Sequence, residues 1–223
     1  MITDKEADIV KRLGIDLDRL KSEQVKISRA VSVIDSLDFD NVDFFGSFSN
    51  FIVGNKILCG VVVVNGEQEV VEEKFFVDKV SFPYLSEFRS YRELPSMIKA
   101  LSLLENKPQL VLIDGLGINH SRLGLATHFS INSSIPSIGI SDSDLGFVIK
   151  GDKFFLDGRQ VGCVVQSKVG SKPLFVSPGS GISIDTSGRI VKSLVTPPHK
   201  LPGVMKLARK YVKRISKEIF GKE

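Results

Sequence analysis

Tryptophan is absent from this sequence, and cysteine, methionine, tyrosine and histidine each occur three times or fewer. The two cysteines, Cys59 and Cys163, lie in separate apolar runs with no second Cys or His at metal-ligand spacing. Buried, reduced thiols are therefore expected, and a disulfide framework or a Cys/His zinc site is excluded. Apolar runs such as residues 57–64 are far shorter than the roughly 18 residues of a membrane helix. We expect a cytoplasmic protein without a membrane segment.

Motifs for common cofactors and nucleophiles are missing as well. The sequence has no GxxxxGK[ST] phosphate loop, no dinucleotide fingerprint placed after a strand, and no GxSxG nucleophile elbow. Each of these motifs carries the chemistry of a large enzyme class. Their absence argues against P-loop nucleotidases, dinucleotide-dependent oxidoreductases and α/β-hydrolases.

The composition is that of one soluble globular domain. Of the 223 residues, 42% are hydrophobic and 25% are charged, so disorder is excluded and a single domain over residues 1–223 is expected. The net charge of +4 is unevenly distributed, because residues 189–223 carry ten Lys or Arg against two Glu, a local +8 that leaves −4 elsewhere. This tail is either a surface that meets a polyanion or the solvated side of an amphipathic helix.

The spacing of apolar residues predicts an α/β fold, a central mixed sheet flanked by helices. The first half is expected to contain helices 5–13 and 20–33, strands 42–53, 57–64 and 69–77, helix 93–104, and strand 110–113 ending at Asp114. The second half is expected to contain helix 122–130, strands 137–140, 161–166 and 174–176, and helices 185–194 and 203–220. Asn65-Gly66 predicts a tight hairpin, since both residues tolerate positive φ. The sheet is thus an antiparallel three-stranded meander joined to parallel strands.

Asp114, in the segment VLIDGLGINH, is the first candidate for chemistry. An acidic residue at the carboxyl end of an apolar strand, followed by glycines, lies where an open α/β sheet binds ligands. Gly115 and Gly117 would provide special backbone angles or allow a ligand to approach closely, and His120 is near enough in sequence to reach the same crevice. The alternative is that Asp114 caps a helix or forms a turn.

Glu93 is the second candidate. A Glu in the first turn of a helix is favoured by the helix dipole alone, so its presence needs no function. If that helix starts over the carboxyl end of the strand that carries Asp114, however, the two carboxylates converge. Two carboxylates are the minimum for holding a hard divalent cation such as Mg²⁺ on phosphate oxygens.

Four segments of the chain occur together in one known family. They are FPYLSEFRSYRELP (82–95), LVLIDGLGINHSRLGLATH (110–128), IPSIGIS (135–141) and PLFVSPGSGISIDTS (173–187). In this order and spacing they resemble endonuclease V, a family with an RNase H-like fold and Mg²⁺-dependent cleavage of nucleic acid near inosine. The resemblance covers residues 42–187 and implies that fold and that activity here.

The resemblance also implies roles for individual residues. Asp114 and Glu93 would bind Mg²⁺, with Mn²⁺ as a substitute, and His120 would assist the attacking water or the leaving group. Tyr84 would enter the strand beside the lesion and stack in place of the extruded base. The other implied contacts with nucleic acid are Pro83, Leu85 and Gly115. The implied reaction is cleavage of a phosphodiester on the 3′ side of inosine in DNA or RNA, by a monomer.

The chain departs from the family pattern at its first strand. That strand reads VDFFGSFSNF where family members carry a metal-binding Asp, and Ser47 falls at this position by spacing from the preceding helix. Asp142 stands in place of a Lys, and Arg209 takes a basic or His position in the last helix. Loss of a carboxylate weakens Mg²⁺ binding. The alternative function is therefore a weakened or inactive nucleic-acid-binding homologue.

Overall fold

The computed structural model describes residues 3–143, 145–168 and 170–221. Its elements are α1 (Asp4–Leu13), α2 (Leu17–Ser28), η1 (Phe39–Asn41), β1 (Phe45–Val53), β2 (Lys56–Val64), β3 (Val70–Lys79), η2 (Ser86–Phe88), α3 (Arg89–Ser102), β4 (Leu110–Asp114), α4 (Leu125–Ser133), β5 (Ser137–Ser141), β6 (Val148–Lys150), β7 (Lys153–Leu156), β8 (Arg159–Val165), β9 (Leu174–Ser180), α5 (Ile184–Ser193) and α6 (Gly203–Phe220). Among these described helices, none is long and apolar enough to cross a membrane.

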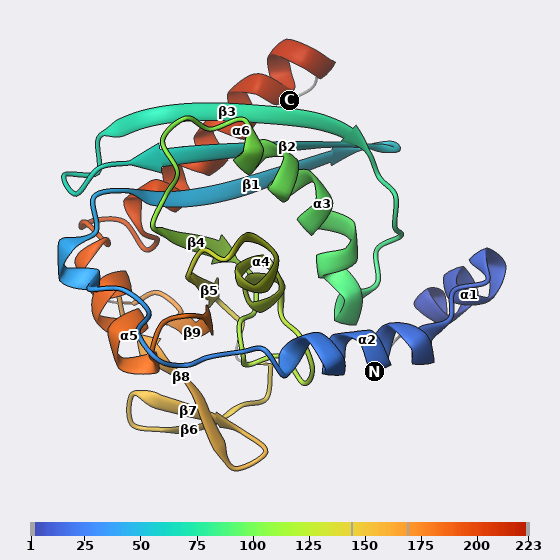
Figure 1. The fold of residues 1–223 in the computed structure, drawn as a ribbon, viewed down its shortest axis with the longest axis horizontal. Coiled ribbons are helices and arrows are strands. Elements are labelled where there is room, and N and C mark those ends of the chain that lie inside the picture. Colours follow the sequence, from blue (N-terminus) through green and yellow to red (C-terminus); the bar gives the residue numbers. More distant parts are fainter. Residues whose placement is uncertain (1–2, 144, 169, 222–223) are drawn as a thin grey trace.

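Within the described ranges, nine strands form one sheet in the order β3-β2-β1-β4-β5-β9-β8-β7-β6 (Figure 1). The first three strands form an antiparallel meander, and β4 pairs in parallel with β1 on one side and β5 on the other. β9 and β8 extend the sheet in antiparallel pairing. The expected α/β architecture, a meander joined to parallel strands, is confirmed.

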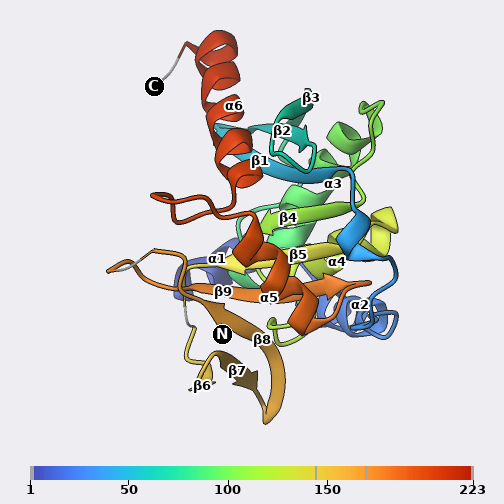
Figure 2. The same cartoon turned by 90° about the vertical axis from the view of Figure 1, so that its left-hand side faces the viewer.

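Helices cover both faces of the sheet and enclose two cores. α5 and α6 pack on one face, and α3 and α4 pack on the other (Figure 2). β4 contributes to both cores, with Leu110 and Leu112 in the first and Val111 and Ile113 in the second. Because successive side chains of a strand point to opposite faces, β4 is buried on both sides until it ends.

Each predicted helix and strand has a counterpart in the structure, but some begin or end at other residues and two short strands are additional. Helix α3 begins at Arg89, four residues before the expected start, because the 3₁₀ turn η2 leads directly into it. Helix α2 ends at Ser28 rather than at residue 33. Strands β6 and β7 are not predicted by the apolar spacing, since they are only three and four residues long and largely lack apolar alternation.

The connection between β2 and β3 is wider than the tight turn expected from Asn65-Gly66. The Gln68 N–H donates to the Asn65 carbonyl at 3.0 Å, and the Asn65 side chain accepts from the Glu69 N–H at 2.9 Å. The left-handed backbone, with φ of 62°, is at Gln68 and not at Asn65 or Gly66. The hairpin prediction is right about the paired strands and wrong about the turn, because the Asn65 side chain closes a longer loop.

Both cysteines are free thiols within strands. Cys59 in β2 is fully buried, whereas Cys163 in β8 is only partly buried, so the expected burial is confirmed for the first alone. Burial raises the pKa of the Cys59 thiol and raises that of Cys163 to about 11. Both side chains therefore remain protonated thiols at neutral pH.

Gly60 lies where β2 passes directly beneath α6. A Cβ atom there would be 2.4 Å from Cγ2 of Val212 and 3.0 Å from the ring of Tyr211. We expect Gly60→Ala to lower the free energy of unfolding by about 1–3 kcal/mol, measured by urea denaturation, because α6 must move away. Gly66→Ala is the control, since nothing lies within 4 Å of a Cβ there. Equal losses in the two variants would contradict the close packing of α6 on β2.

Candidate active site

Asp114 ends β4 at the carboxyl edge of the parallel strands. Its side chain is 51% exposed, and its Oδ2 lies 2.7 Å from an Nη2 atom of Arg209, which is 50% exposed on α6. An ion pair this open to water contributes less than about 1 kcal/mol, because solvent screens it. A cation or a phosphate that enters the site can therefore separate the two side chains at little cost.

Glu93 approaches the same edge from α3 and is nearly buried, with 8% of its side chain exposed. Arg89, one turn earlier, donates from Nε and Nη2 to the two carboxylate oxygens at 2.5 and 3.1 Å. The Asn50 amide donates to Glu93 Oε2 at 2.8 Å. Burial alone would lower the pKa of Arg89, but the hydrogen bonds and charge of Glu93 raise it, with a further contribution from Asp114. The Glu93 carboxylate is thus held in one orientation.

Glu93 and Asp114 line one cavity of about 220 Å³, enclosed by residues of β1, β4, α3, α4 and α6. The two carboxylates therefore face the same space, as expected if α3 lies over the carboxyl end of β4. No group of three or more His, Cys, Asp or Glu side chains that could share a metal ion occurs in the described part of the chain. Glu93 and Asp114 are the acidic side chains that line this cavity.

A second cavity, of about 310 Å³, adjoins the first and shares Asp114 and Arg209 with it. Lys200 and Lys206 also line it, so positive charge gathers beside the carboxylates. The ammonium of Lys200 lies 3.4 Å from Oδ2 of Asp142. A lysine from the loop before α6 thus places a positive charge next to Asp142, just after the end of β5.

Ser47 lies on the face of β1 that packs under α6, which is the face that Asp114 shares in the neighbouring strand β4. Its Cα partners in the neighbouring strands, Val62 and Leu112, belong to the core under α6. Its buried hydroxyl donates to the Leu112 carbonyl at 2.8 Å. Because side chains alternate along β1, the position next to it, Phe48, faces α3 instead. A carboxylate at residue 47 would be buried on the sheet face of Asp114, because Asp114 comes two residues after Leu112, the partner of Ser47.

The glycine-rich loop after Asp114 packs directly on other backbone. A Cβ atom at Gly117 would lie 2.2 Å from the Pro178 carbonyl oxygen of β9, and neither Gly115 nor Gly117 has a positive φ. Gly117 is therefore required by the close approach of the chain to itself, not by a ligand. The Gly115 N–H already donates to the Ile140 carbonyl at 3.0 Å, so it is not free to contact a base.

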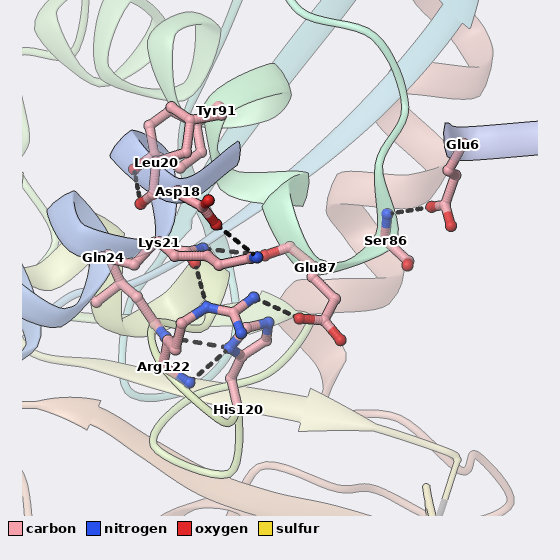
Figure 3. A network of polar contacts seen from close by, with 11 residues as sticks. Glu6, Asp18, Leu20, Lys21, Gln24, Ser86, Glu87, Tyr91, His120 and Arg122 are labelled. Atoms are coloured by element: carbon pink, nitrogen blue, oxygen red, sulfur yellow. Dashed lines mark hydrogen bonds and ion pairs between the residues drawn. The ribbon is translucent and has the colours of Figure 1, made fainter. Parts of the chain in front are cut away.

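His120 belongs to a polar network behind this loop (Figure 3). Its Nδ1 accepts from the backbone N–H groups of Arg122 and Leu123, both at 3.1 Å. The Arg122 guanidinium pairs with Glu87 and donates to Gln24 Oε1 at 2.7 Å. Burial and the charge of Arg122 lower the pKa of His120 to about 4, so the imidazole is neutral at pH 7. His120 lines neither of the two cavities, and the structure does not bring it together with the two carboxylates.

The three implied wedge residues lie in the loop between β3 and η2 and differ in exposure. Tyr84 is 55% exposed, with the Arg92 guanidinium 5.8 Å from its ring centroid. Pro83 is partly exposed, whereas Leu85 is completely buried. Leu85 is therefore an anchor for the loop rather than a surface available to nucleic acid. Tyr84 and Pro83 remain the accessible part of the predicted wedge.

Three residues of the site were missed from the sequence. Arg89 has a detectable signal, because it is four residues before Glu93 on one helix face. Asn50 has a weaker one, since it shares a strand face with Phe48. Lys200 has none, because only the folding of its loop brings it to Asp142.

The fold and the site define an α/β protein in which two carboxylates and a basic helix meet at the carboxyl edge of parallel strands. The family model for endonuclease V matches residues 26–210. The endonuclease V of Dictyoglomus thermophilum is 34% identical over an alignment 223 positions long, which covers 95% of this chain and 95% of that one. The chain belongs to the endonuclease V family.

Solved structures agree with this assignment. The catalytic domain of human endonuclease V matches with a TM-score of 0.84 at 22% identity, covering 92% of this chain and 97% of that one. The Ciona intestinalis endonuclease V, solved with a 24mer DNA containing an inosine followed by a ribo-adenosine, matches with a TM-score of 0.82 at 24% identity, covering 91% and 98%. The expected RNase H-like fold class is confirmed.

His128, which is buried, and His120, which is partly buried, should make the free energy of unfolding depend on pH. Burial lowers the pKa of His120 and His128 to about 4, whereas an unfolded imidazole titrates near 6.5. Below about pH 6.5 the unfolded chain binds more protons, so the free energy of unfolding should fall between about pH 6.5 and 4, by up to about 1.4 kcal/mol per unit for each histidine.

Urea denaturation at several pH values measures this slope. The double variant His120→Asn and His128→Asn should have a clearly shallower slope, because neither site can then take up a proton. His199→Asn, at an exposed histidine, is the control and should keep the original slope. An unchanged slope in the double variant would show that the histidines are not responsible.

Proposed function

We propose that this protein cleaves a phosphodiester on the 3′ side of inosine in DNA or RNA, using Mg²⁺ or Mn²⁺. The observation that carries the proposal is the cavity shared by Glu93 and Asp114, which adjoins a second one lined by Lys200 and Lys206. Metal-assisted phosphodiester hydrolysis uses acidic groups that hold a cation beside basic groups that bind phosphate. The inosine-containing DNA bound by the Ciona intestinalis relative supports the choice of substrate.

The oxygen atoms of the first cavity suit a hard divalent cation. Two carboxylates, those of Glu93 and Asp114, line it together with Asn50, whose buried carbonyl oxygen has no hydrogen-bond partner in the described part of the chain. Mg²⁺ takes oxygen ligands of these kinds and usually keeps several waters, so few protein ligands suffice. When bound, the cation supplies charge neutralisation for the phosphate and activation of a water molecule.

The basic residues around the cavities have separate tasks in this proposal. Arg209 leaves Asp114 when substrate enters and contacts a phosphate oxygen, because its exposed ion pair is weak. Lys200 adds positive charge next to Asp142. Arg89 stays on Glu93 and orients that carboxylate. His120 acts as a positioning residue for the loop after β4 and does not touch the substrate.

The second candidate function is nucleic-acid binding without cleavage. It is favoured by the arginines, because each carboxylate of the first cavity already has a guanidinium partner, Arg89 or Arg209. A guanidinium neutralises a carboxylate as a metal ion would, but it does not activate water. In this case the protein would recognise inosine through the Tyr84 loop and hold the strand through α6.

Cleavage assays separate the two functions. DNA and RNA oligonucleotides with one inosine, and adenosine controls, should be nicked once on the 3′ side in Mg²⁺ or Mn²⁺. Asp114→Asn should lower the rate about 100-fold, because a carboxylate ligand becomes a neutral amide. Asp43→Asn, at an exposed acid before β1, should leave it unchanged. If the unmodified protein nicks no faster than Asp114→Asn yet binds in a salt-dependent way, the binding function is correct.

Tyr84 is expected to provide discrimination rather than general affinity. Tyr84→Ala should reduce the preference for inosine over adenosine strands about tenfold, because a ring that stacks on bases contributes about 1–3 kcal/mol. Tyr84→Phe retains the ring and should keep the preference. Fluorescence anisotropy with labelled strands measures both affinities. Equal weakening for the two strands in Tyr84→Ala would rule out a wedge at this residue.

A further inference from the structure

Strand β1 presents one polar side chain toward Glu93. Along the face of β1 that meets α3, Phe48 packs in the apolar core and Asn50 comes next, with its Nδ2 donating to Glu93 Oε2 at 2.8 Å. Ser47 points to the other face of β1, and its hydroxyl donates to the Leu112 carbonyl. Asn50 is therefore the β1 residue that the fold brings into contact with the proposed cation-binding carboxylate.

The amide of Asn50 is satisfied on one side only. Its Oδ1 atom is buried and has no hydrogen-bond partner among the residues that the structure describes, although a buried carbonyl oxygen without a partner is unfavourable. Rotating the amide would not help, because Oδ1 would then face the Glu93 carboxylate and Nδ2 would lose its acceptor. The hydrogen bond to Glu93 thus fixes an orientation that leaves one oxygen atom in need of a positively polarised ligand.

We propose that Oδ1 of Asn50 is the β1 ligand of the divalent cation, completing an oxygen set with Glu93 and Asp114. The proposal rests on the proposed function, which needs a cation in this cavity, and adds a third oxygen ligand to it from β1. All three residues line the same cavity. Amide carbonyl oxygens are accepted ligands of hard divalent cations, and a neutral one leaves the site with less negative charge.

This ligand set predicts a weak site that a single substitution strengthens. Asn50→Asp restores a third negative charge, so it should bind Mn²⁺ about tenfold more tightly. In the absence of metal the same variant places two carboxylates side by side, so its melting temperature should fall and then recover on addition of Mn²⁺. Asn50→Leu keeps the approximate volume but has no oxygen, so it should bind Mn²⁺ about tenfold more weakly.

Mn²⁺ binding to the full chain without nucleic acid tests this directly. Electron paramagnetic resonance of free Mn²⁺ gives the affinity, and melting curves with and without Mn²⁺ report folding. Asn55→Asp is the matched control, because it adds the same charge at the exposed turn between β1 and β2 and should leave the affinity unchanged. If Asn50→Leu does not fold, the comparison of Mn²⁺ affinity between Asn50→Asp and the control Asn55→Asp decides the outcome.

The outcomes distinguish this proposal from the proposed function. If Asp114→Asn weakens Mn²⁺ binding but Asn50→Asp and Asn50→Leu match the unmodified protein, the carboxylate site stands and the role of Asn50 is wrong. If the unmodified protein binds no Mn²⁺ at millimolar concentration and Asn50→Asp does not either, both are overturned. Tighter binding by Asn50→Asp and not by Asn55→Asp supports Asn50 as the ligand.

Discussion

The parallel pairing of β4 with β1 and β5 is the constraint on which the rest of the molecule depends. The side chains of β4 alternate between two apolar cores, so no polar residue is tolerated along it until the strand reaches the carboxyl edge. Asp114 emerges at that point. Parallel pairing brings the end of β5 to the same edge, and α3 and α6 close over it from opposite faces, so both cavities form there.

Positive and negative side chains that are far apart in the sequence neutralise one another at this edge of the sheet. The basic tail folds back as α6 and places Arg209 on Asp114, while Arg89 neutralises Glu93 within α3. The first pair is exposed and easily separated, whereas in the second pair the Glu93 carboxylate is nearly buried and held in place. The site therefore combines one adaptable acidic group with one fixed acidic group. When the first pair opens, Asp114 is free to meet a cation and Arg209 to meet a phosphate.

A buried polar network supports the loops on either side of the cavities. Gln24 of α2 is fully buried, donates to the Glu87 carbonyl at 2.9 Å and accepts from Arg122, so it ties η2 to the loop after β4. Glu6 of α1 accepts from the Ser86 N–H at 2.7 Å, next to the predicted wedge (Figure 3). The amino-terminal helices thus set the position of the loop that carries Tyr84.

The sequence by itself determined the order of helices and strands apart from β6 and β7, the family, and the choice of Asp114 and Glu93, which line one cavity, because apolar periodicity and local motifs are encoded in neighbouring residues. The assignment of Ser47 to the first-strand position stays a prediction, and the strand register places Ser47 on the same face of the sheet as Asp114. The sequence also placed His120 beside the carboxylates, although the backbone N–H groups of Arg122 and Leu123 hold its ring in place and it lines neither cavity. Only the tertiary structure decided the contact of Asn50 with Glu93, because that contact depends on the register of β1 against a helix 43 residues away.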